Sequence, residues 1–188
     1  MVEFLVKNKT IVYALTTVIG SVLFLLSVGV HVLCIFELNV GDSFPVWLLH
    51  LAALLVIVPF VLISATEERR EKETPVTIED TIRDPERYKK RPGSTPWNVP
   101  GWLGTIYLLL FLYLAANFVI FVFIPKGQPG IIDGKYVLHN HGHIIGELDK
   151  KEYDIASARF LRGASGHWIL FSLVAATGSY FASKEAKR

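Results

Sequence analysis

The stretch from Ile11 to Phe36, IVYALTTVIGSVLFLLSVGVHVLCIF, contains no Lys, Arg, Asp or Glu and decides the class of fold. A helix needs about 20 consecutive apolar residues to cross the hydrocarbon core of a bilayer. This stretch is longer than that, and it is also longer than the apolar part of a cleaved signal peptide, which has up to about 15 residues. We therefore predict a membrane-spanning helix over residues 11–36.

Three more stretches without charged residues follow, at 46–65, 102–124 and 165–182. The last is the shortest and contains several serines and glycines, but exposing Trp168 and its apolar neighbours to water would be costly. Small residues are also typical of a membrane helix that packs against other helices. We predict an all-α membrane protein, a bundle of four transmembrane helices in which residues 1–188 form a single membrane domain.

The composition agrees with this class. Hydrophobic residues make up 52% of the chain and its mean hydropathy is +0.42, while charged residues make up 19%, against about 25% in a soluble domain. A net charge of +2 gives no indication of a nucleic-acid partner. Cys34 is the single cysteine, which excludes an intrachain disulfide and a zinc site built from cysteines.

The distribution of basic residues predicts the orientation. The N-terminal segment, the 66–101 loop and the C-terminal tail contain thirteen Lys and Arg residues, and the segments 37–45 and 125–164 contain six. Cytoplasmic loops carry the excess of basic residues. We therefore predict both termini and the 66–101 loop on the cytoplasmic side of a plasma (inner) membrane, with 125–164 as the outer loop.

The cytoplasmic loop has two parts. Residues 67–73 have mixed charges and are expected to extend the second helix into solvent. A short basic cluster follows, formed by Arg87, Lys89, Lys90 and Arg91. This cluster either fixes the topology of the chain or contacts anionic lipids, since basic residues beside a membrane do both.

The outer loop has the pattern of a small folded unit. Residues 134–139 and 143–148 flank Asn140-His-Gly142, which predicts an extramembrane β-hairpin. Asp149 and Glu152 have the spacing of a capping box, which predicts a helix through about Leu161.

In that helix, Tyr153, Ala156 and Phe160 form a narrow apolar stripe, so we expect an amphipathic helix along the membrane surface. Gly163 and Gly166 are then expected to turn the chain into the fourth span.

This topology places all six histidines toward the outer side. His31, His50 and His167 lie near the outer ends of three predicted spans, with His31 and His50 at similar depth. Ionisable groups in a bilayer usually face the protein interior and have a partner. Two interpretations follow: the three histidines are interfacial residues that reach water, or they bind a haem or a transition metal such as zinc or copper.

Three more histidines, His139, His141 and His143, lie in the predicted hairpin. If they form a hairpin, His139 and His143 should pair across the turn with His141 at its tip. Short histidine-rich tracts bind metals in some proteins, so this group is a second candidate metal site.

No Walker loop, GxGxxG, HExxH or GxSxG pattern is present, so the sequence does not point to an enzyme. The leading hypothesis is a non-catalytic accessory component that acts through the lipid bilayer and through contacts with other membrane proteins or with a second copy. A haem- or metal-binding protein is the first alternative, and a small channel or transporter subunit is the second.

Overall fold

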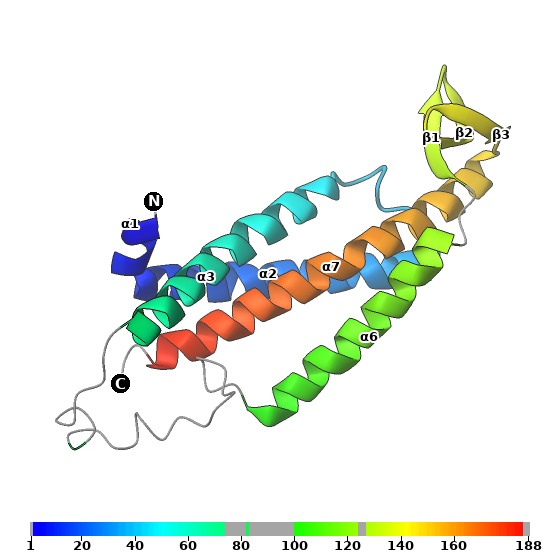
Figure 1. Cartoon of the computed structure of the whole chain (residues 1–188). Coiled ribbons are helices and arrows are strands. Elements are labelled where there is room, and N and C mark those ends of the chain that lie inside the picture. Colours follow the sequence, from blue (N-terminus) through cyan, green and yellow to red (C-terminus); the bar gives the residue numbers. More distant parts are fainter. Residues whose placement is uncertain (1, 74–81, 83–99, 124–126, 186–188) are drawn as a thin grey trace.

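The structure is a computed structural model that describes residues 2–73, 82, 100–123 and 127–185 (Figure 1). Its helices and strands are α1 (Val2–Lys7), α2 (Lys9–Ile35), α3 (Trp47–Glu73), α6 (Gly101–Phe123), β1 (Gln128–Ile132), β2 (Lys135–Asn140), β3 (His143–Glu147) and α7 (Lys150–Glu185). The long helices run side by side, with the sheet at one end and α1 and the C-terminal end of α7 at the other.

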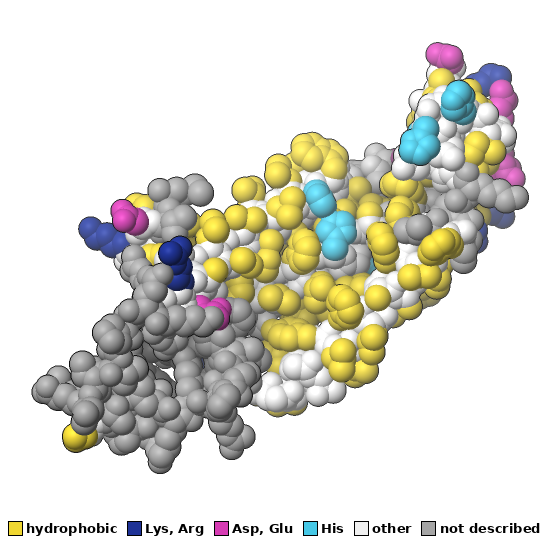
Figure 2. Space-filling model, in the orientation of Figure 1, with side chains coloured by type: hydrophobic (Ala, Val, Ile, Leu, Met, Phe, Trp, Pro, Cys, Tyr) yellow, Lys and Arg dark blue, Asp and Glu magenta, His cyan; other side chains and the backbone are white. Residues whose placement is uncertain are grey.

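Three of the helices are long and apolar enough to cross a membrane: α2, α3 through Arg69, and α6 through Phe121. They match the first three predicted spans. Many of their leucines face outward; Leu25, Leu55 and Leu109 are each more than 60% exposed. Figure 2 shows hydrophobic side chains over the middle of the visible face and charged side chains toward its two ends. This surface is the one a membrane protein requires, because lipid tails solvate it.

The fourth predicted span lies within α7, and here the prediction was partly wrong. α7 is a single helix of 36 residues, so the separate surface helix and the turn at Gly163 and Gly166 do not form. Both glycines are instead contact points for α6. A Cβ atom at position 163 would lie 2.2 Å from the ring of Phe121, and one at position 166 would lie 2.8 Å from a Leu114 methyl. The glycines let a neighbouring helix approach rather than bend their own.

α2 and α7 pack along most of their lengths through a seam of mostly small side chains. On α7 the buried positions follow a seven-residue repeat: Ala158, Ser165, Ser172 and Ser179, with Leu161, Trp168, Ala175 and Ala182 three residues later. A 3.5-residue average spacing is typical of helices that cross at about 20°. α7 contacts all three of the other long helices, α2, α3 and α6.

Small and polar residues of α2 form a buried stripe along the helix. Thr16, Gly20, Ser27 and His31 are all buried in α2. Gly20 sits against Ala176, where an added Cβ would be 3.1 Å from the backbone nitrogen and Cβ of that residue. A Cβ at this position would be crowded, so the glycine favours the close approach of the two backbones.

The charged extension of the second predicted helix is also confirmed, since α3 continues to Glu73. Glu67 pairs there with Lys9 and accepts a hydrogen bond from the Tyr13 hydroxyl at 3.0 Å, which joins the ends of α2 and α3. The basic cluster of Arg87, Lys89, Lys90 and Arg91 lies outside the described residues.

The predicted hairpin forms, but it belongs to a three-stranded antiparallel sheet in the order β1-β2-β3. His141 and Gly142 have positive φ at the second turn, as an Asn-x-Gly turn requires. The expected pairing of His139 with His143 is wrong: the turn consists of two residues, His141 and Gly142, so Asn140 pairs with His143 and His139 pairs with Ile144. β1 was not predicted, although Asp133-Gly134 is a strong hairpin signal.

The start of α7 was predicted correctly. The Asp149 carboxylate accepts from the Glu152 amide at 2.7 Å, and the Glu152 carboxylate accepts from the Asp149 amide at 2.9 Å. This capping box fixes where the helix begins, directly after β3. Tyr153 stacks on Tyr136 of β2, with ring centroids 4.7 Å apart, so the expected apolar stripe begins under the sheet.

Candidate functional site

His31 is the most buried of the described histidines that the sequence placed near helix ends, with 4% of its surface exposed. Its Nδ1 lies 2.8 Å from the Ser165 hydroxyl of α7, and its Nε2 lies 2.7 Å from the Tyr113 hydroxyl of α6. Both ring nitrogens are therefore used, and the side chain links three helices. Neither Ser165 nor Tyr113 was predicted as a partner.

One arrangement of protons satisfies this whole group. Ser165 Oγ lies 3.0 Å from the carbonyl of Arg162 and donates to it. His31 then donates from Nδ1 to Ser165, and Tyr113 donates to Nε2. A serine beside an imidazole also resembles a nucleophile and its base, but Ser165 has no exposed surface, so a substrate does not reach it in this conformation. The group satisfies buried polar atoms and holds the helices in register.

His50 and His167 form a second, separate group. Nδ1 of His50 lies 2.6 Å from Nε2 of His167 and 3.2 Å from the indole nitrogen of Trp168. Because an indole N–H only donates, Nδ1 of His50 is the acceptor and His167 is the other donor. His50 is exposed at the surface of α3, so this pair lies at the edge of the bundle.

The three predicted histidines lie at similar depth but not at one point. His31 contacts position 165 of α7, and His50 contacts positions 167 and 168. Positions 165 and 167 are about 200° apart around the axis of α7, so Ser165 and His167 lie on different faces, and Trp168, about 60° from Ser165, lies between them. The first group joins α2, α6 and α7, and the second joins α3 and α7, so the three histidines form two groups.

The hairpin histidines do not gather either. His139 packs its ring against Gly130 of β1, where a Cβ would lie 2.9 Å from its Cδ2 and Nε2. Its Nδ1 is buried without a hydrogen-bond partner among the described atoms. His141 lies in the turn and His143 begins β3. Within the described parts of the chain, no group of three or more His, Cys, Asp or Glu residues has a metal-binding arrangement.

An exposed charge cluster joins the 36–46 loop to α7. Asp154 accepts from Asn39 at 2.9 Å, and Lys150 pairs with Asp154 at 2.6 Å and with Asp42 at 3.0 Å. The hydrogen bond from Asn39, followed by that from Lys150, lowers the pKa of Asp154. Asp154 and then Asp42 raise the pKa of Lys150 through their hydrogen bonds. Arg159 adds a link to Glu37 at 2.7 Å.

No protein-family model matches this chain, and neither the curated proteins nor the solved structures give a significant match.

Proposed function

We propose that the chain is a non-catalytic integral membrane component that holds a small folded unit at a fixed height outside the membrane. That unit, the outer module, consists of β1, β2, β3, the start of α7 and the 36–46 loop. The observation that supports this best is the continuity of α7, which carries the outer module at one end and the buried seam of the bundle along the rest. A single rigid helix transmits position from the membrane to the sheet.

Four spans, rather than three, belong to this proposal. α7 has fewer apolar residues than α2, α3 and α6, but it packs along α2 and returns to the end where α1 lies (Figure 1). A central helix is shielded from lipid by its neighbours and needs less apolar surface of its own. The excess of basic residues at the α1 end supports cytoplasmic termini in a plasma membrane.

The partner is proposed to be another membrane or secreted protein, because the outer module offers an unpaired strand edge. β3 pairs only with β2 in the described sheet, and its Ile144 and Ile145 are about half exposed. An exposed strand edge with apolar side chains is a common recognition surface.

Site-specific photocrosslinking in native membranes tests the proposal. A photoreactive amino acid at Ile145 is expected to give one discrete protein adduct, and the same residue at lipid-facing Leu25 is expected to give none. The protein is purified in parallel and reconstituted in liposomes to measure solute flux. Flux through the purified protein, or equal protein adducts from both positions, would refute an accessory role.

A transition-metal site is a second candidate function, favoured by the 2.6 Å separation of the His50 and His167 nitrogens. Two neutral imidazoles on adjacent helices supply part of a zinc or copper site, with other ligands completing it. Elemental analysis and an absorption spectrum of the detergent-purified protein provide the test. Bound metal should be lost in His50→Ala and kept in His141→Ala; a metal-free wild-type protein would rule the site out.

A further inference from the structure

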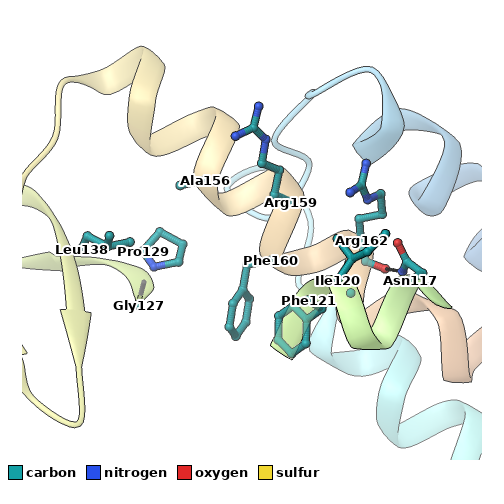
Figure 3. Close-up of a pocket in the computed structure, with 11 residues that line it drawn as sticks. Asn117, Ile120, Phe121, Gly127, Pro129, Leu138, Ala156, Arg159, Phe160 and Arg162 are labelled. Atoms are coloured by element: carbon teal, nitrogen blue, oxygen red, sulfur yellow. Dashed lines mark hydrogen bonds between the residues drawn. The ribbon is translucent and has the colours of Figure 1, made fainter. Parts of the chain in front are cut away.

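A pocket of about 210 Å³ lies where α6 ends beneath the sheet. Figure 3 shows its walls: Pro129 and Leu138 from the sheet, Phe160 from α7, and Phe121 from α6. Pockets that enclose a drug-sized molecule usually exceed about 300 Å³. The size therefore suits part of a larger molecule whose remainder lies outside.

The pocket combines an apolar wall with a cationic rim. Arg159 and Arg162 line it, and Figure 3 shows both guanidinium groups extending to the same side of α7, away from the rings of Phe160 and Phe121. None of the described lining residues is acidic. The fitting ligand therefore has an anionic group beside a hydrocarbon part.

Arg162 differs from Arg159, the other arginine that lines the pocket. The Arg159 side chain, which is 62% exposed, forms an ion pair with the Glu37 side chain, which is 45% exposed. The Nε atom of Arg162 is buried and has no hydrogen-bond partner among the described atoms. A buried donor without a partner is costly, and a charged one more so. An anion at the rim would satisfy it.

The depth of the pocket identifies the source of that anion. Asn117, Ile120 and Phe121 line it, and they form the last turn of the α6 candidate span. The pocket thus opens where the hydrocarbon of a bilayer meets its head groups. Phosphate groups of lipids lie at this level, and arginine binds phosphate with two parallel hydrogen bonds.

We propose that this pocket binds an anionic phospholipid of the surrounding membrane, with its phosphate at Arg159 and Arg162 and the start of an acyl chain against Phe121 and Phe160. An anionic rather than a zwitterionic lipid is favoured because two arginines line the pocket and the Glu37 carboxylate beside them is already paired with Arg159. The site is separate from the strand edge of β3, so it stands or falls independently of the accessory role.

Native mass spectrometry of the full chain in an uncharged detergent measures the binding of short-chain phosphatidylglycerol. Arg162→Gln is expected to weaken binding about tenfold, as the loss of a hydrogen bond to a charged group does. Ala156→Phe fills the pocket without changing charge and is expected to reduce binding as well. Lys135→Gln, on the exposed face of the sheet, removes the same charge elsewhere and should bind like wild type.

Three results would overturn the proposal: unchanged binding in both pocket variants, an equal loss in Lys135→Gln, or displacement of the lipid by inorganic phosphate at similar concentrations. The last would show a site for free anions. If Arg162→Gln does not fold, Arg162→Lys replaces it, since lysine keeps the charge but loses the two parallel hydrogen bonds. Wild-type affinity in both Arg162→Lys and Ala156→Phe would then refute the lipid site.

Discussion

Hydrogen bonds between single side chains connect three of the long helices. Ser165, His31 and Tyr113 are polar groups on three different helices, and each satisfies another at 2.7 to 2.8 Å. In the hydrocarbon core of a bilayer, no water is available to form hydrogen bonds with a polar group that lacks a protein partner. We therefore expect the loss of any residue of this group to lower the stability by more than its own contact, because its partner is left without a hydrogen bond.

Replacing Ser165 by Ala tests this at the residue scale. The change leaves Nδ1 of His31 buried without an acceptor, which should cost about 1–3 kcal/mol in the free energy of unfolding. SDS titration in mixed micelles measures it. Ser21→Ala is the matched control, because the exposed Ser21 hydroxyl bonds only to the Thr17 carbonyl of its own helix. Equal stability of the two variants would contradict the role given to Ser165.

At the scale of elements, the seam between α2 and α7 is the main interface of the bundle. Small residues on both helices let the backbones approach, and van der Waals contact replaces the hydrophobic effect that lipid does not provide. The seven-residue repeat on α7 begins at Ala158, in the part of the helix that follows the sheet. The same stripe therefore packs the bundle and leads to the outer module.

Gly20→Val should destabilise this seam. The new side chain meets the Ala176 backbone at about 3.1 Å, which cannot move aside as a side chain can, and overpacking typically costs about 1–3 kcal/mol. A Cβ added at Gly29, in the same helix, has no neighbour within 4 Å, so Gly29→Val should change stability far less. Thermal unfolding in detergent compares the two; similar melting temperatures would show that the close approach is not required.

The charge cluster joining the 36–46 loop to α7 predicts a pH dependence. Because the pKa of Asp154 is lowered, its ionised carboxylate stabilises the docked loop at any pH above the ordinary aspartate pKa. This stabilisation is lost as the pH falls through the lowered pKa. Because the pKa of Lys150 is raised, its ammonium group stabilises the docked loop at any pH below the ordinary lysine pKa. This stabilisation is lost as the pH rises through the raised pKa. The loop should stay docked between these limits.

Spin labels at Ser43→Cys and Lys151→Cys report the docking of this loop by their separation. We expect a short, narrow distance distribution at neutral pH that broadens in strong acid, and in Asp154→Asn already at neutral pH. Asp133→Asn removes the same charge at the first sheet turn and should behave like wild type. If wild type, Asp154→Asn and Asp133→Asn gave the same distance distribution, the charge cluster would not be what holds the loop against α7.

For the whole molecule, the four-span proposal makes a prediction about sidedness. A membrane-impermeant thiol reagent applied to intact cells should label His141→Cys and not Asp80→Cys, and lysed cells should show both. Cys34 is buried and gives little background. Labelling of both positions from the same side would exclude the single crossing by α6 that the proposal places between them.

The sequence alone predicted three helices that are long and apolar enough to cross a membrane, the capping box and the second hairpin. These follow from local rules: the length of uncharged stretches, the spacing of Asp149 and Glu152, and the geometry of Asn-x-Gly. It also placed His31 and His50 at similar depth, because rise per residue is the same in every helix.

Only the tertiary structure decided which residues meet. Whether Gly163 turns the chain or receives Phe121 depends on where α6 lies, and no local pattern contains that. The same holds for the histidines: depth is fixed by position along a helix, but the face is fixed by how α7 rotates against its neighbours. That rotation brings Ser165 into contact with His31 and His167 into contact with His50. It also separates two groups for which the sequence predicted only a similar depth.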